Sequence, residues 1–133
     1  MKAKKVNEFK RGQDMKKSLN VGKYRNPPEQ EDVDVVIDEL FFLWDELTEE
    51  PGRMSVSRYY EGDGTVFEVD ARGEWRLYST EFYRMAWREL VKSGLKFDIR
   101  YHAKGRFDIY VWPKWRTGEP PLNIFDAKRL GFE

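Results

Sequence analysis

Apolar positions in the first half of the chain follow a helical period. Between Asn26 and Glu49 they recur at steps of four and three, which places them on one face of a helix. Asn26 as cap, Pro27 as first helical residue and Glu29 at the capping-box position predict the start of this helix. Pro51 predicts its end, and Phe42 falls toward the opposite, acidic side. The apolar face comprises Val33, Ile37, Leu40, Trp44 and Leu47.

A second helix is predicted for residues 80–93. Ser79 or Thr80 is the expected cap, and Gly94 is the expected C-terminal stop. The predicted buried stripe comprises Phe82, Tyr83, Ala86, Trp87, Leu90 and Val91.

Three strands are predicted between these helices. Residues 54–60 and 65–70 flank Glu61-Gly62-Asp63-Gly64, a sequence typical of a β-hairpin turn. A third strand is predicted for residues 74–78, after a turn at residues 71–73.

Residues 95–112 show the clearest hairpin pattern. Apolar and polar residues alternate on both sides of residues 103–105. A three-residue loop with Gly105 in the left-handed conformation would place Arg100 opposite Asp108. One face of this hairpin carries Phe97, Ile99, Tyr101, Phe107, Ile109 and Val111.

The element order α-β-β-β-α-β-β predicts a single α+β domain. We expect a mainly antiparallel sheet with two helices on one face. Pro113 is expected to end the last strand, so that residues 113–133 form a Pro-rich tail that packs back on the domain. The domain is expected to occupy residues 26–133, and residues 1–25 are expected to form an arm that is flexible or bound to a partner.

Charge is sorted into blocks along the chain. Residues 1–28 carry nine basic and two acidic side chains (net +7), and residues 29–50 carry ten acidic and no basic ones (net −10). The rest contributes +3, so the formal net charge is zero. This sorting predicts that the arm binds an acidic surface, either on a protein partner or on the helix beside it. The candidate partner-binding residues are Lys4, Lys5, Phe9, Lys10, Arg11, Lys16, Lys17, Leu19 and Tyr24.

Composition excludes several classes of function. The chain has no cysteine, which excludes disulfides, a thiol nucleophile and cysteine-ligated zinc. It has a single histidine, which excludes a histidine-cluster metal site and disfavours a Ser-His-Asp triad. No stretch approaches the ~20 apolar residues of a membrane span. We therefore expect a cytoplasmic, non-enzymatic protein with no cofactor, no metal and no membrane contact.

The outward side of the last hairpin is a candidate surface for single-stranded nucleic acid. Basic side chains beside aromatic rings on a sheet can stack bases and follow a phosphate backbone. The alternative is that the tail or the long helix covers this face, because exposed tryptophans are costly. The candidate residues are Lys96, Arg100, Arg106, Tyr110, Trp112 and Trp115.

Two aspartates of this hairpin have the residue type of a catalytic carboxylate pair. In the predicted register, however, Asp108 is neutralised by Arg100 and Asp98 lies opposite Tyr110. His102 is expected at the turn. These positions do not predict acid–base catalysis.

Acidic residues suggest two further kinds of site. Glu61, Asp63 and Asp70 flank glycine turns, but their spacing is too short for a calcium loop, and a solvated turn is the simpler interpretation. The acidic helix presents spaced carboxylates that can imitate a row of phosphates. The candidate mimic residues are Asp38, Glu39, Asp45 and Glu46.

The N-terminal sequence resembles a short header found on small bacteriophage proteins. The resemblance lies in VNEFKRGQD (residues 6–14) and KSLNVG (residues 17–22), with Met15 where such headers have proline. It implies an accessory or virion-associated role, in the cytoplasm of an infected bacterium or in the virion.

Three hypotheses of function follow. The first is a small, phage-derived binding or accessory protein that acts through protein–protein contacts, with the basic arm as its docking element. The second is single-stranded nucleic-acid binding by the arm and the aromatic and basic sheet face. The third is an inhibitor whose acidic helix mimics phosphates in a host nucleic-acid-binding protein.

Overall fold

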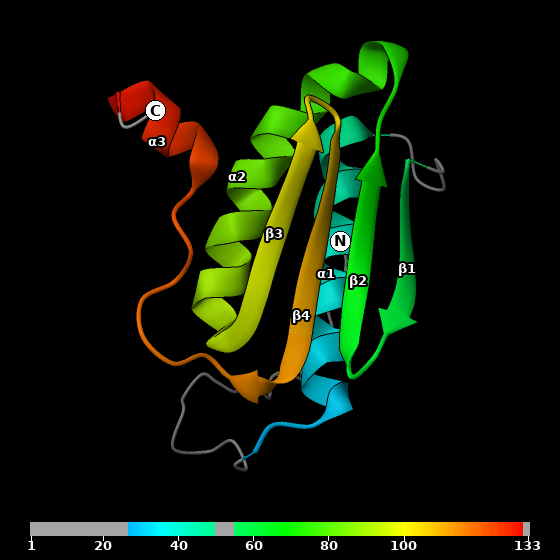
Figure 1. The fold of residues 1–133 in the computed structure, drawn as a ribbon. Helices are drawn as coiled ribbons and strands as arrows, with labels where there is room; N and C mark the ends of the chain where they lie inside the picture. The colour runs from blue at the N-terminus through cyan, green and yellow to red at the C-terminus, as the bar shows by residue number, and fades with distance from the viewer. Residues whose placement is uncertain (1–26, 50–54, 132–133) are drawn as a thin grey trace.

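The computed structural model describes residues 27–49 and 55–131 of the chain. They form a four-stranded antiparallel sheet with two long helices on one face and no helix on the other (Figure 1). The strand order across the sheet is β1-β2-β4-β3. The predicted α+β class and the placement of both helices on one face are confirmed.

The elements are α1 (Gln30–Thr48), β1 (Val56–Glu61), β2 (Gly64–Asp70), the 3-10 turn η2 (Gly73–Trp75), α2 (Arg76–Ser93), β3 (Leu95–Ala103), β4 (Arg106–Trp115) and α3 (Ile124–Leu130).

Helix α1 begins later than the sequence predicts. Glu29, not Asn26, is the N-cap, and it forms a reciprocal capping box with Asp32, whose carboxylate accepts the Glu29 backbone N–H at 2.8 Å. Pro27 therefore lies before the helix, and Asn26 lies outside the described residues. The predicted end is confirmed, with Glu49 as a left-handed C-cap.

The strand predicted for residues 74–78 is wrong. Residues 73–75 form η2, and α2 starts at Arg76. Trp75 and Tyr78 pack on the core at helical spacing with Phe82, while Leu77 is exposed. Ser79, a predicted cap, lies inside the helix, and its hydroxyl donates to the Arg76 carbonyl at 2.7 Å. The apolar stripe of α2 is thus longer than predicted, whereas its end at Gly94 is confirmed.

The β3–β4 hairpin has the predicted register, with Arg100 opposite Asp108. Its loop differs in detail, because Ala103 pairs with Arg106 and the ladder shifts between Tyr101 and Ala103. Gly105 has a φ of 89°, and a Cβ there would lie 2.6 Å from the Ala71 carbonyl oxygen, so this turn requires glycine.

Pro113 does not end β4, which continues to Trp115. The ladder to β3 shifts between Leu95 and Lys96, leaving Pro113 at an irregularity where its missing N–H costs no ladder bond.

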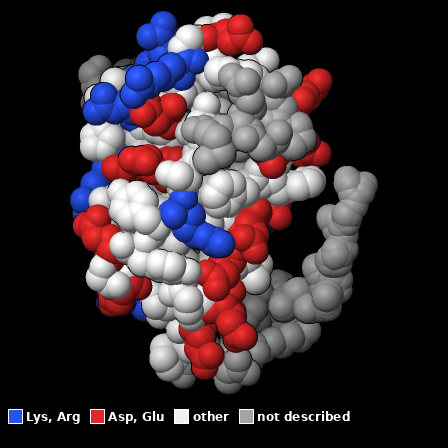
Figure 2. All heavy atoms as spheres, turned by 90° about the vertical axis from the view of Figure 1, so that its right-hand side faces the viewer, with Lys and Arg blue, Asp and Glu red and all other residues white. Residues whose placement is uncertain are grey.

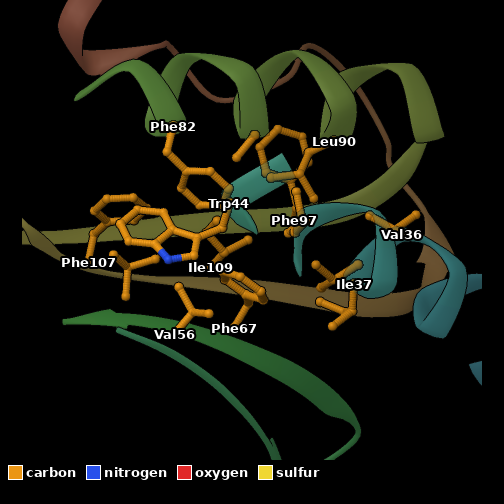
Figure 3. Packing of buried hydrophobic residues seen from close by; sticks show 14 of the residues in the cluster. Val36, Ile37, Trp44, Val56, Phe67, Phe82, Leu90, Phe97, Phe107 and Ile109 are labelled. Carbon is orange, nitrogen blue, oxygen red and sulfur yellow. The ribbon is translucent and has the colours of Figure 1, made fainter. Parts of the chain in front are cut away.

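The core lies between the helices and the inner face of the sheet. Trp44 of α1 is fully buried and packs edge-on against Phe82 of α2, with 5.2 Å between ring centroids. Figure 3 shows Trp44 between Phe82 and the sheet residues Phe67 and Phe107. The predicted apolar face of α1 is therefore confirmed, although Leu47 is only partly buried.

The tail packs back on the domain, as predicted. The Trp87 indole donates to the Pro121 carbonyl at 2.8 Å. Phe125 of α3 packs edge-on against Tyr83 and Tyr101, at 4.7 and 5.6 Å between ring centroids.

Candidate functional site: an acidic helix face beside an open sheet

The solvent side of α1 combines exposed apolar residues with carboxylates. Val35 is 68% exposed and Phe42 is 39% exposed, and the two lie two helical turns apart on the same side. Residues at helical spacing from them are acidic and exposed or half-buried. We name this surface the acidic stripe: Glu31, Val35, Asp38, Glu39, Phe42, Asp45, Glu46 and Glu49.

The side of α1 opposite the stripe explains why the stripe faces water. Val33, Ile37 and Leu40 are fully buried against α2 and the sheet. Because these residues fix the rotation of the helix, Val35 and Phe42 must point away from the core.

Arg58 of β1 links the acidic stripe to the edge of the sheet. Its Nη1 lies 3.5 Å from Asp38 Oδ1 and 3.9 Å from Asp34 Oδ1. Partial burial raises the pKa of Asp38, an effect that Arg58 opposes and Asp34 reinforces. Figure 2 shows acidic groups gathered on this side of the molecule, with basic atoms beside them. Arg58 thus balances part of the acidic charge on the β1 side.

The C-terminal end of the stripe is acidic where a helix favours cations. Its last turn contains no basic residue, while Asp45, Glu46 and Glu49 lie in or next to that turn. The helix dipole adds partial negative charge at the same end. Acidic side chains and the negative end of the helix dipole therefore coincide at this end of α1.

The open sheet face carries a ladder of rings and cations. Lys96 Nζ lies 4.8 Å from the centre of the Trp112 ring, and Trp112 stacks on Tyr110 at 6.0 Å. The Arg100 guanidinium lies 3.9 Å from the centre of the Tyr110 ring. Trp112 crosses the start of β2, where a Cβ on Gly64 would lie 3.0 Å from its indole nitrogen. The predicted face exists, and no helix covers it within the described residues.

Carboxylates on the same face balance these cations. Arg100 Nε lies 3.7 Å from Asp98 Oδ2, and His102 Nε2 lies 3.0 Å from Asp108 Oδ2. Tyr110 is only 6% exposed. Burial raises the pKa of Tyr110, while Arg100 acts to lower it. The open face is therefore a packed surface on which cationic and anionic side chains alternate and pair.

Two predicted residues of this face lie elsewhere or at its margin. Trp115 packs against the core cluster, with ring atoms 3.7 Å from where a Cβ on Gly94 would stand, so it does not belong to the open face. Arg106 is exposed at the start of β4. The predicted arm residues, from Lys4 to Tyr24, lie outside the described residues.

The close contact between His102 and Asp108 was not expected from the sequence, because it depends on the ladder shift near the turn. The His102 side chain is 42% exposed. The hydroxyl of Ser57, on the same face, donates to Glu68 at 3.1 Å and not to the imidazole. These contacts do not form a nucleophile–base–acid relay.

Neither a metal-holding group of side chains nor a membrane-spanning helix is found in the part of the chain that the structure describes. Within residues 27–49 and 55–131 no group of three or more His, Asp or Glu side chains is arranged to hold a metal ion. Across the same ranges, no helix has both the length and the apolar character needed to cross a membrane.

The chain matches no protein-family model, no curated protein and no solved structure.

Proposed function

We propose that this protein is a small non-enzymatic binding protein that acts through protein–protein contacts, and that the acidic stripe is one of its contact surfaces. The observation that carries the proposal is the exposure of Val35 and Phe42 at the centre of a row of carboxylates. The complementary partner is a basic segment with apolar side chains at helical spacing.

The acidic stripe combines exposed apolar side chains with surrounding charges of one sign, as protein interfaces do. Burying an apolar side chain of this size contributes roughly 1.5–3 kcal/mol, scaled by the fraction still exposed. Val35 and Phe42 supply that term, and the surrounding carboxylates speed encounter with a basic partner and disfavour acidic ones.

The basic arm is the second contact element in this proposal. Its cations and the apolar residues Phe9, Leu19 and Tyr24 suit docking on an acidic and partly apolar surface. The resemblance of residues 6–22 to bacteriophage headers supports an accessory role during phage infection.

Single-stranded nucleic acid is the second candidate ligand, and the ladder of Lys96, Trp112, Tyr110 and Arg100 favours it. We rank it lower because the Tyr110 ring is already stacked on both neighbours. In addition, Asp98 and its neighbouring carboxylates on the face repel phosphates.

The phosphate-mimic hypothesis assigns binding to the same helix but requires different residues of it. A mimic binds through its carboxylates, including Asp38 and Glu46, and has no use for apolar anchors. Substituting Val35 and Phe42 would therefore leave a mimic active, whereas it would weaken the contact proposed here.

Fluorescence polarisation of labelled probes tests the proposal. The first probe is a lysine-rich peptide with leucine at every third or fourth position, and its matched control has serine in place of leucine. The third probe is a single-stranded oligothymidylate. We expect the full-length protein to bind the leucine-containing peptide most tightly.

The variant Val35→Ser/Phe42→Ser should weaken that binding about tenfold or more, which corresponds to about 1.4 kcal/mol. Leu77→Ser is the matched control, because Leu77 is 70% exposed on a different helix, α2. Equal affinity of all three proteins for the peptide would overturn the proposal. Salt-dependent binding of the oligonucleotide that Arg100→Ala abolishes would favour the nucleic-acid function instead.

A further inference from the structure

We infer that the edge of the sheet along β1 is a further binding site, which takes up an extended segment of a protein partner as an added antiparallel strand. The segment carries basic side chains on the side that faces α1 and β-branched side chains on the other. This site goes beyond the proposed function, because it uses the backbone of β1 and does not depend on Val35 or Phe42.

Alternate residues of β1 present backbone hydrogen-bonding groups to the open edge. The Asp70 N–H donates to the Ser55 carbonyl at 2.8 Å, so these two residues form a hydrogen-bonded pair next to β1 and β2. Such pairs alternate with non-hydrogen-bonded ones in an antiparallel ladder. Val56, Arg58 and Tyr60 therefore direct their N–H and C=O groups away from β2. In the part of the chain that the structure describes, only β2 pairs with β1, and these groups can form a ladder with an added strand.

The opposite edge of the sheet, along β3, is protected in ways that β1 lacks. The ladder of β3 shifts near both of its ends, and Phe125 of α3 packs against Tyr101 on this side (Figure 1). Strand β3 also contains Lys96, and lysines, bulges and covering helices are devices that prevent pairing at sheet edges. Strand β1 keeps one register with β2 along its whole length and contains neither lysine nor proline. It is therefore the edge that can accept a strand.

The α1 side of the β1 edge carries an excess of negative charge. Arg58 lies 3.9 Å from Asp34 and 3.5 Å from Asp38, so two carboxylates share one guanidinium and the net charge of the three groups is −1. The side chains of Asp34 and Asp38 are 42% and 71% exposed. Figure 2 faces this side of the molecule and shows the acidic groups there. A further cation on this side of an added strand is complementary to that charge.

Tyr60 provides a second contact for such a cation. Its ring is 63% exposed, and it pairs with Thr65 of β2. Gln30 of α1 donates to the Thr65 hydroxyl at 3.0 Å, which places the first turn of α1 at the Tyr60 end of β1. A basic side chain directly opposite Tyr60 therefore lies beside an aromatic ring and toward Asp34, one helical turn after Gln30.

The outer side of β1 favours uncharged partners. Tyr59 is 39% exposed and lies opposite Val66 of β2. Aromatic and β-branched residues are favourable cross-strand neighbours, so valines of the added strand suit the positions beside Tyr59. Opposite Arg58 a polar, uncharged residue is preferred, because a like charge there is destabilising.

Fluorescence polarisation with the labelled peptide TKVTVKT and the full-length protein tests the inference. In an extended strand both lysines and the central threonine lie on one side and the valines on the other. When the threonine pairs with Arg58, its N–H faces β1, whereas the valine N–H groups face away. N-methylation of the central threonine should therefore abolish binding, and N-methylation of one valine is the matched control that should not. Equal effects of the two methyl groups would overturn the inference.

Protein variants test the charge of the site and separate it from the acidic stripe. Asp34→Asn/Asp38→Asn should weaken binding of TKVTVKT about tenfold or more. Glu81→Gln is the control, because Glu81 is an exposed acid of α2, and unchanged affinity of the double variant would contradict the inference. Val35→Ser/Phe42→Ser should bind TKVTVKT normally. A protein that binds the leucine-containing peptide but not TKVTVKT overturns this inference and leaves the proposed function standing.

Amide hydrogen exchange of the full-length protein shows what occupies the edge. We expect the amides of Arg58 and Tyr60 to exchange rapidly in the free protein and to be protected by TKVTVKT, while the Tyr59 amide, already paired with β2, changes little. Protection of Arg58 and Tyr60 without peptide at low protein concentration would assign the edge to the same chain. Protection that grows with protein concentration would assign it to a second copy. Either result would overturn the inference.

Discussion

The acidic stripe of α1 and the open face of the sheet are both solvent-facing surfaces with rings and charges, but they differ in the mixture of charges and in how far their central side chains are exposed. On the sheet, Arg100 stacks on Tyr110 and also lies near Asp98, and Tyr110 is nearly buried. On the stripe, Val35 and Phe42 remain exposed among residues of one charge.

The difference shows which kind of surface can receive a partner. On the sheet, a ligand would first have to displace contacts that the side chains already make with one another. On the stripe, apolar area is still open to water, and the charge around it is of one sign. Residue types alone favour the sheet face as a binding site, whereas the exposure of Val35 and Phe42 favours the helix.

The largest expected effect contrasts the two sides of α1. Leu40→Ala should lower the free energy of unfolding by about 2–5 kcal/mol, because it opens a cavity in the core. Val35→Ala on the opposite side should change it by no more than about 0.5 kcal/mol. Urea denaturation measures both, and equal losses would show that the stripe side is also packed.

The second test asks whether the open sheet face is a packed layer. Tyr110→Ala should lower the free energy of unfolding by about 1–3 kcal/mol, because it removes the ring between Arg100 and Trp112. Tyr60→Ala is the control, since Tyr60 is 63% exposed on β1 and should cost far less. If the two variants are equally stable, the ladder does not hold the face together.

The third test concerns Tyr83, a buried tyrosine of α2. Burial raises the pKa of Tyr83 from 10.0 to about 12, against the opposing hydrogen bond with the Ile124 backbone. Between these two values the unfolded chain has lost its proton and the folded chain has kept it, so stability falls as pH rises through this window. We expect a fall of about 1–2 kcal/mol after allowing for solvent screening.

Tyr83→Phe keeps the ring contacts with Phe107 and Phe125 and removes the titrating hydroxyl. Urea denaturation of both proteins at several alkaline pH values should therefore show a steeper loss for the unsubstituted chain. Parallel curves would mean that Tyr83 titrates as it does in the unfolded chain.

The smallest expected effect concerns the link between the stripe and the sheet. Arg58→Ala removes a surface ion pair and should cost only about 0.2–1 kcal/mol. It should also raise the pKa of Asp38 further, because Arg58 acts to lower it. An NMR pH titration of the Asp38 carboxyl measures this shift, and an unchanged pKa would place Arg58 away from Asp38 in solution.

Much of the fold was predictable because short-range patterns agree with one another. In the last hairpin, the alternation on both strands and Gly105 specify the same register, and Arg100 does lie opposite Asp108. The strand predicted for residues 74–78 failed because a five-residue window fits either period. There, the core contacts of Trp75 and Tyr78 continue the stripe of α2.

The candidate site was less predictable because it depends on which surfaces are already occupied. The helical periodicity of the apolar residues placed the acidic residues of α1 on its solvent-exposed face, but it did not identify Val35 as exposed. The contact between Arg58 and Asp38 joins residues twenty positions apart in the sequence, and no local pattern signals it. The stacked ladder likewise arises from neighbours on two strands, so its members were predictable from the sequence but their mutual burial was not.

The most direct test of the account is an NMR comparison of the backbone amide resonances of the full-length protein, free and saturated with the lysine-rich, leucine-containing peptide. We predict that the resonances of Val35, Phe42 and Glu46 shift on peptide binding, while those of Lys96, Arg100 and Tyr110 stay in place. Shifts confined to Lys96, Arg100 and Tyr110, with the stripe unchanged, would contradict the claim that α1 is the contact surface.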